Sequence, residues 1–262
     1  MDKSKERAWE IIKTYIHAAK DLAFIKAIIL VGSLSDDTYT GNAGSDIDLV
    51  HIVSDEVDYQ LERSTIIRLI GQIEEQTGHD IPISRVVFQE QHLVHPYQYD
   101  FELKPENKDL IERPIEIFRV LDNGIVLMGD PGIIDSLEHP TREDVLETKK
   151  LGRKQLEILR TEDPAFYREY QKTTENPSLR IMTQIVLTTA LSEYFFYTDK
   201  SCSSKYHILQ RVEKDLPDLP YLNLLRLCHK NRFSPEEITE KDRINMGEEY
   251  QSLFLPRPKT WL

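Results

Sequence analysis

Two aspartates separated by a single residue, Asp46 and Asp48, are the side chains of this sequence best suited to metal chemistry. They open residues 46–53, whose alternating apolar pattern is typical of a β-strand. Side chains two positions apart on a strand point to the same face, so the two carboxylates should stand side by side. Adjacent carboxylates repel each other unless a cation binds between them, and magnesium prefers oxygen ligands together with substrate phosphates. The pair therefore predicts a site for a metal–triphosphate complex.

A tight turn that suits phosphate binding precedes the two aspartates. The β-branched run of residues 24–31 predicts a buried strand, and this strand ends directly at Gly32 and Ser33. Glycine lets the backbone approach a phosphate closely, and amides that enter a following helix donate hydrogen bonds at its positive end. The Ser33 hydroxyl is a further donor. We therefore expect Gly32 and Ser33 to bind nucleotide phosphates.

A third acid is expected on a neighbouring strand. Residues 80–88 predict a third strand, which Pro82 displaces towards an edge or a bulge. Asp80 opens this run, so it is the candidate for a third metal ligand or for the base that accepts the proton of an attacking hydroxyl. The rival candidates for this role are Glu90 and Glu102.

The combination of these features is more informative than its parts. An isolated acid-x-acid pair is usually a solvated turn or strand end, and an isolated Gly-Ser is weaker still. Here an apolar strand, a Gly-Ser and a spacer of twelve residues precede an acid pair that opens a second strand. This order favours catalysis over coincidence.

The arrangement resembles the nucleotidyltransferase superfamily of DNA polymerase β, whose pattern is Gly-Ser, a spacer and Asp-x-Asp. Later motifs are similar to those of aminoglycoside adenylyltransferases that act on streptomycin and spectinomycin. The similar segments are residues 96–99 with Glu102-Leu103, residues 124–129, residues 186–189 and Lys205. The resemblance spans residues 25 to about 215.

This resemblance implies roles for individual residues. It implies that Asp46 and Asp48 bind magnesium, and that a third-strand carboxylate, a glutamate in the family and Asp80 here, is the base. Lys205 matches a lysine that the family directs at the nucleotide phosphates, whereas Ser192 stands where an arginine is expected. That second nucleotide contact is therefore missing or supplied elsewhere.

The acceptor site is the part of the family pattern that this sequence reproduces least. The tryptophan and aspartate that family members use for the drug do not occur just before the helix expected at residues 178–197. Tyr170 and Glu175 stand in that region and, with Glu102, are the candidates for binding an acceptor.

The surrounding pattern predicts an α+β fold in two domains: a nucleotidyltransferase domain with a mixed sheet and flanking helices over residues 1–138, and an all-helical domain over residues 139–262. Nucleotide and acceptor are expected to meet between them. Residues 104–116, rich in lysine and glutamate, are expected to form a solvated connection. The expected helices cover residues 4–21, 57–77, 141–160, 178–197, 203–214 and 218–230.

Composition restricts the possible partners and the compartment. The chain has 262 residues and a formal net charge of -12, which disfavours nucleic acid and suits a cationic small molecule. It has two cysteines without a CxxC spacing and no run of about 18 apolar residues, so a cytoplasmic protein without a membrane partner is expected.

These observations predict magnesium-dependent transfer of a nucleoside monophosphate, AMP from ATP, to a hydroxyl of a small molecule of aminoglycoside type, with release of pyrophosphate. A monomer or a homodimer fits this reading. The alternatives are a non-catalytic nucleotide-binding or toxin–antitoxin partner protein on the same fold, and a nucleotidyltransferase with a protein acceptor.

Overall fold

The computed structural model describes residues 3–41, 45–104, 107–175 and 177–254. The chain divides into two compact units, Met1–Pro140 and Thr141–Leu262. The division lies close to the expected domain boundary at residue 138. The first unit combines helices with a sheet, and in the second the elements of the described residues are helical.

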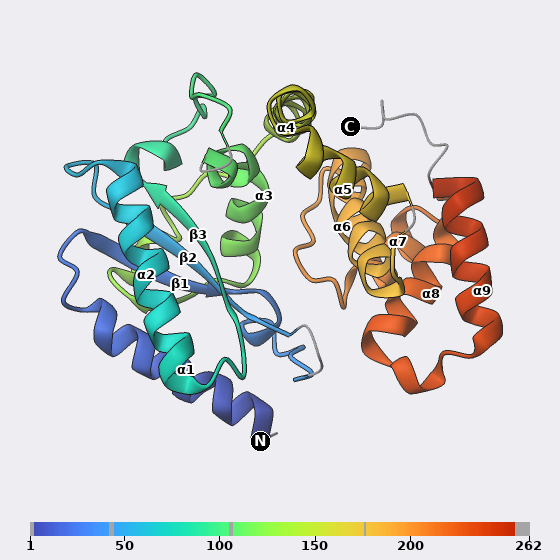
Figure 1. Cartoon of the computed structure of the whole chain (residues 1–262), viewed down its shortest axis with the longest axis horizontal. Coiled ribbons are helices and arrows are strands. Elements are labelled where there is room, and N and C mark those ends of the chain that lie inside the picture. The colour runs from blue at the N-terminus through green and yellow to red at the C-terminus, as the bar shows by residue number, and fades with distance from the viewer. Residues whose placement is uncertain (1–2, 42–44, 105–106, 176, 255–262) are drawn as a thin grey trace. The chain divides into compact units, whose positions relative to one another are not determined.

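The first unit is built on a mixed four-stranded sheet in the order β3-β2-β1-β4 (Figure 1). Strand β1 runs antiparallel to β2 and β4, whereas β2 and β3 are parallel. The elements are α1 (Lys3–Ala19), β1 (Ile25–Val31), η1 (Gly32–Leu34), β2 (Ile47–Val53), α2 (Tyr59–Thr77), β3 (Ile83–Gln89), η2 (Glu90–Leu93), α3 (Lys108–Asn123), β4 (Ile125–Met128) and η4 (Pro131–Ile133).

The two faces of this sheet carry separate apolar cores. Because side chains alternate along a strand, Leu30 and Leu49 pack on one face together with α1 and α2. Ile29 and Val50 pack on the other face, against Leu110 and the rest of the apolar side of α3. Asp48, two positions before Val50 on β2, therefore faces α3 and not α1.

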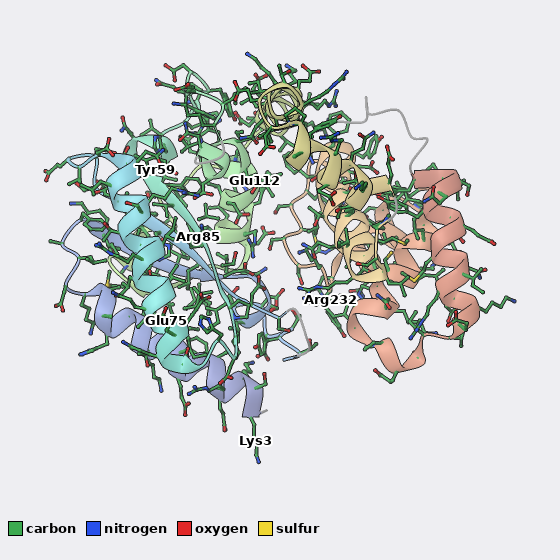
Figure 2. The ribbon with its side chains drawn as sticks, in the orientation of Figure 1. Lys3, Tyr59, Glu75, Arg85, Glu112 and Arg232 are labelled. Carbon is green, nitrogen blue, oxygen red and sulfur yellow. The ribbon has the colours of Figure 1, made fainter. Side chains whose placement is uncertain are left out.

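Helix α2 is fixed at both ends. The Asp58 side chain accepts a hydrogen bond from the Leu61 amide at 3.0 Å, and Gly78 ends the helix in the left-handed conformation. The Tyr59 hydroxyl donates to the carbonyl of Val87 on β3 at 3.0 Å, which ties the helix start to the sheet. Figure 2 marks Tyr59 at this end of α2, with Arg85 on β3.

The expected solvated connection at residues 104–116 is wrong from Lys108 onwards, where α3 begins. Leu110 and Ile111 are buried, and the buried Arg113 guanidinium lies 4.5 Å from the centre of the Tyr97 ring. The charged residues and Pro114 mask the apolar face of this helix in the sequence. Burial of the apolar side against the sheet outweighs the low helical preference of proline.

The second unit is a helical bundle whose core comes mainly from α6, α7, α8 and α9. No helix among the described residues is both long enough and apolar enough to cross a membrane. The sequence pattern did not predict the second and the last of its α-helices. The elements are α4 (Arg142–Glu162), α5 (Pro164–Glu175), α6 (Leu179–Thr198), α7 (Ile208–Asp215), α8 (Leu222–Phe233), η5 (Pro235–Glu237), α9 (Glu240–Glu249) and the π-helical turn η6 (Tyr250–Phe254).

Candidate active site

The turn after β1 and the beginning of β2 meet at one edge of the sheet. In the antiparallel pair, Val31 lies opposite Asp48, so Gly32 follows beside that aspartate. Gly32 has a φ of 78°, a conformation that residues with a Cβ rarely adopt. A Cβ at Gly32 would overlap Oδ2 of Asp48 and lie 2.9 Å from Nη2 of Arg119. A side chain at this position would be strained by the positive φ and would require the Asp48 carboxylate or the Arg119 guanidinium to shift.

The hydrogen bonds of the turn leave the Ser33 side chain available. The amides of Ser35 and Asp36 and the Ser35 hydroxyl all donate to the carbonyl of Gly32. Ser33 is half-buried at the centre of η1. Its hydroxyl makes no hydrogen bond to another residue of the described part of the chain, so it is open to a ligand.

The two predicted metal acids lie at the amino end of β2. Asp48 belongs to the strand and has a side chain 17% exposed, and Asp46 is half-buried directly before the strand begins. The Ile47 amide donates to the carbonyl of Pro82 at 2.9 Å, which fixes this end of β2 against β3. By alternation with Val50, the Asp48 carboxylate faces α3.

An arginine that the sequence analysis missed binds this carboxylate. Nη2 of Arg119, on α3, donates to Oδ2 of Asp48 at 2.7 Å, and Nη1 donates to Oε2 of Glu116 at 2.9 Å. Burial lowers the pKa of the Arg119 guanidinium, but the charges of Glu116 and Asp48 outweigh burial and raise this pKa above its ordinary value. Arg119 therefore carries a full positive charge beside the turn that the sequence predicts to bind phosphate.

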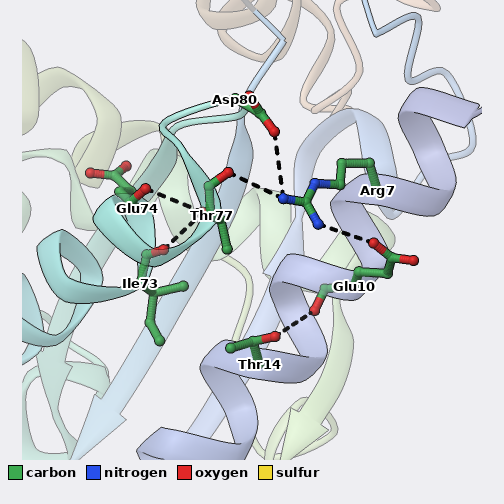
Figure 3. Close-up of polar contacts among 7 residues, drawn as sticks. All are labelled: Arg7, Glu10, Thr14, Ile73, Glu74, Thr77 and Asp80. Atoms are coloured by element: carbon green, nitrogen blue, oxygen red, sulfur yellow. Dashed lines mark hydrogen bonds and ion pairs between the residues drawn. The ribbon is translucent and has the colours of Figure 1, made fainter.

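Asp46, Asp48 and Asp80, all within the described residues, do not form a group placed to hold one metal ion. Asp80 lies in the turn between α2 and β3, three residues before the strand begins, with a side chain 57% exposed. Nη2 of Arg7, on α1, approaches its Oδ2 to 3.5 Å and donates to the carbonyl of Thr77 at 3.1 Å (Figure 3). Asp80 thus contacts α1, which packs on one face of the sheet, whereas Asp48 contacts Arg119 of α3, which packs on the other face.

Strand β3 supplies no other acid to the site. It contains no aspartate or glutamate, and the residue paired with Asp48 is Ser84. Of the rival candidates, Glu90 is exposed beyond the far end of the strand, and Glu102 is 70% exposed and paired with Lys104. The acid that shares a cation with Asp48 is Glu116 on α3, at an i, i+3 spacing from Arg119.

The remaining predicted ligands belong to the second unit. Lys205 is half-buried in the turn before α7, and Ser192 is buried inside α6, where its hydroxyl donates to the carbonyl of Thr188 at 3.3 Å. Glu175, at the end of α5, accepts a hydrogen bond from the Gln171 side chain at 2.8 Å. Tyr170 lies on α5, and its side chain falls outside the described part of the chain.

The oxygen donors of Asp46 and Asp48 fit a magnesium ion that also binds substrate. In the described ranges no group of three or more histidine, cysteine, aspartate or glutamate side chains is placed to hold a metal ion. Magnesium commonly takes one or two protein carboxylates and completes its shell with phosphates and water. Two aspartates beside the predicted phosphate-binding turn are the donors that this requirement calls for.

The comparisons with known proteins support the fold. No protein-family model matches the chain, and no curated protein sequence does so. A crystal structure of spectinomycin adenyltransferase AAD(9) from Enterococcus faecialis, with ATP and spectinomycin, matches it with a TM-score of 0.59. The match covers 93% of this chain and 97% of that chain at 14% sequence identity. The predicted fold, a mixed sheet with flanking helices followed by a helical region, is thereby confirmed.

Proposed function

We propose that this protein transfers AMP from ATP to a hydroxyl of a small, cationic molecule of aminoglycoside type and releases pyrophosphate. One observation carries the proposal: Gly32 lies directly against the Asp48 carboxylate, because a Cβ built on Gly32 would overlap Oδ2 of Asp48. A turn suited to phosphate and an acid suited to a metal ion therefore meet at one point. The adjoining Asp46 gives that point a second carboxylate.

The roles of the residues follow from this geometry. The Gly32 and Ser33 backbone and the Ser33 hydroxyl would bind phosphate oxygens, and Asp46 and Asp48 would hold a magnesium ion. Such an ion would supply positive charge to the triphosphate for an in-line displacement. Lys205 is proposed, from the resemblance alone, as a further phosphate ligand.

The reaction is an attack of the acceptor oxygen on the α-phosphorus of ATP. A bond forms between this oxygen and the α-phosphorus, the bond from the α-phosphorus to the β-phosphate oxygen breaks, and pyrophosphate leaves. The hydroxyl proton passes to a base or to water. Strand β3 carries no acid, so we assign none of its side chains to this proton transfer. Asp80, which precedes β3, contacts Arg7 of α1.

The charge of the chain supports a cationic acceptor. A formal net charge of -12 attracts polyamines such as aminoglycosides and repels nucleic acid. The similar structure was determined with ATP and spectinomycin, so these two molecules are the first ligands to test.

A second candidate function is a non-catalytic nucleotide-binding protein on the same fold. The observation that favours it is the absence of a carboxylate from β3, where the family that the sequence resembles has its base. Such a protein would bind ATP with magnesium and transfer nothing. The two candidates therefore differ in turnover and not in nucleotide binding.

A pyrophosphate-release assay distinguishes these candidates. The protein is incubated with ATP, magnesium and a panel of aminoglycosides and aminocyclitols, with Asp48→Asn as the matched control. We expect release that depends on at least one acceptor, and a loss of this release in the variant. Magnesium-dependent ATP binding without release for any acceptor would support the non-catalytic alternative.

A further inference from the structure

We propose that Arg119 is a displaceable cation: it occupies Asp48 in the nucleotide-free protein and turns to the triphosphate when magnesium and nucleotide bind. Glu116 anchors the guanidinium in both states. This inference rests on the proposed function, because it assigns a nucleotide contact to the same site. It makes Arg119 a phosphate-binding residue that helix α3 supplies.

The position of Nη2 is the first argument. This atom lies 2.7 Å from Oδ2 of Asp48, the carboxylate proposed to hold magnesium. It is also 2.9 Å from the position that a Cβ of Gly32 would take, so it lies against the backbone proposed to bind phosphate. A metal ion that binds Oδ2 must therefore replace this hydrogen bond, and the released donor lies beside the incoming phosphates.

The second argument is that the guanidinium has two separate attachments. Nη1 binds Glu116 at 2.9 Å, one helical turn away on α3, while only Nη2 binds Asp48. Release of Asp48 therefore leaves the arginine held in place by Glu116. The guanidinium fork matches the geometry of phosphate oxygens and stays charged throughout.

Charge balance is the third argument. Asp48 and Glu116 are nearly buried, with side chains 17% and 11% exposed, and Arg119 neutralises part of their charge. Magnesium replaces this neutralisation at Asp48 when it binds. The triphosphate brings additional negative charge to the same place, and an arginine freed from Asp48 can interact with it.

Competition between Arg119 and the metal gives a specific test. The wild-type protein, Arg119→Gln and Arg119→Lys are titrated with Mn²⁺ alone by electron paramagnetic resonance, and with ATP plus magnesium by calorimetry. Arg63→Gln is the matched control, because Arg63 is another largely buried arginine of the first unit and pairs with Asp109. Circular dichroism checks that each variant is folded.

The two affinities should change in opposite directions in Arg119→Gln. Mn²⁺ alone should bind about fivefold more tightly or better, because a positive charge beside the metal site is removed. ATP with magnesium should bind about tenfold more weakly or worse, because one charged hydrogen bond is lost. Arg119→Lys keeps the competing charge, so its Mn²⁺ affinity should stay low while its ATP affinity falls. Arg63→Gln should change neither affinity.

A structural role for Arg119 predicts a different pattern. Both affinities would then fall together in Arg119→Gln, or neither would change, and either outcome overturns the inference. If Arg119→Gln does not fold, Arg119→Lys decides, because an unchanged ATP affinity in that variant is also contrary to the inference. Failure of the proposed function is seen separately, as a wild-type protein that binds ATP equally in magnesium and in EDTA.

Discussion

At the scale of single residues, Gly32 joins the proposed phosphate-binding turn to Asp48, the proposed metal ligand. Its φ is positive, which strains a residue with a side chain, and a Cβ at this position would overlap Oδ2 of Asp48. We expect Gly32→Ala to destabilise the protein by about 1 to 3 kcal/mol through backbone strain. It should also abolish magnesium-dependent ATP binding, because the methyl group must displace the Asp48 carboxylate or the Arg119 guanidinium. Thermal unfolding and calorimetry measure the two effects.

Gly71 provides the matched control for this substitution. It lies within helix α2, and a Cβ there would meet no atom within 4 Å. Gly71→Ala should therefore leave ATP binding unchanged and stabilise the protein by about 0.5 to 1 kcal/mol. A Gly32→Ala variant that binds ATP as the wild type does would contradict the proposed geometry of the turn.

Glu62 gives a residue-scale prediction about pH. It is buried in the first turn of α2, where no residue of the described ranges hydrogen-bonds its carboxylate oxygens. The nearby Gln89 amide donates instead to the carbonyls of Ser54 and Val57. Burial, together with the charges of Asp55 and Asp58, raises the Glu62 pKa from 4.5 to about 7.

The sign of this effect follows from proton linkage. The folded protein keeps the Glu62 proton between pH 4.5 and about 7, whereas the unfolded chain loses it, so Glu62 lowers the free energy of unfolding as pH rises through this window. Glu62→Gln removes the ionisation. It should raise the melting temperature more at pH 8 than at pH 4.5, and an equal change at both pH values would show that the carboxyl titrates normally.

At the scale of elements, helix α3 positions Arg119 and Glu116. Leu110 is 4% exposed and packs α3 against the sheet. We expect Leu110→Ala to lower the free energy of unfolding by about 2 to 5 kcal/mol, because it leaves a cavity beneath the helix. Leu61, 60% exposed on α2, is the control, and Leu61→Ala should change stability by less than about 0.5 kcal/mol. Equal effects in denaturant titrations would contradict this packing.

The turn between α2 and β3 gives a second prediction at this scale. If Asp80 were the base, Asp80→Ala would lower turnover by about two to four orders of magnitude. Because Asp80 is exposed and faces Arg7, we expect turnover within about twofold of wild type and a loss of less than about 1 kcal/mol of stability. Single-turnover kinetics with an active acceptor decide between these outcomes. A severe defect would indicate that Asp80 acts as the base after all.

The elements that the sequence predicted well are those in which apolar residues recur at a clear helical or strand spacing. The strand before Gly32, the strand that contains Asp48 and the helix after it all appear within a few residues of their expected bounds. Pairing of β1 with β2, which the chain order favours, is sufficient to bring Gly32 to Asp48. The turn and one metal acid were therefore accessible from the sequence.

The parts of the site that the sequence did not predict depend on tertiary packing. The charged residues at the start of α3 obscure its apolar periodicity in the sequence. The sequence therefore predicted no helix that would position Glu116 and Arg119. The third strand begins at Ile83 and not at Asp80, because the left-handed residues Gly78 and His79 first turn the chain back towards α1. The strand therefore begins three residues after the position expected for the base.

At the scale of the whole molecule, the four-stranded sheet and its helices hold the proposed phosphate and metal ligands in the first unit. The predicted acceptor residues Tyr170 and Glu175 lie in the second unit, and their role stays a prediction. The fold is similar to that of a spectinomycin adenyltransferase, while the proposed chemistry rests on a few side chains around Gly32 and Asp48. A direct measurement of the transferred group therefore tests the central claim.

That measurement follows two labels through the reaction. The protein is incubated with magnesium, an acceptor from the aminoglycoside panel, and ATP labelled at either the α- or the γ-phosphate, with Asp48→Asn as the control. We predict that the α label appears on the acceptor and the γ label in pyrophosphate, and that the variant transfers neither. A γ label on the acceptor, or equal transfer by the Asp48 variant, would contradict the proposed nucleotidyl transfer.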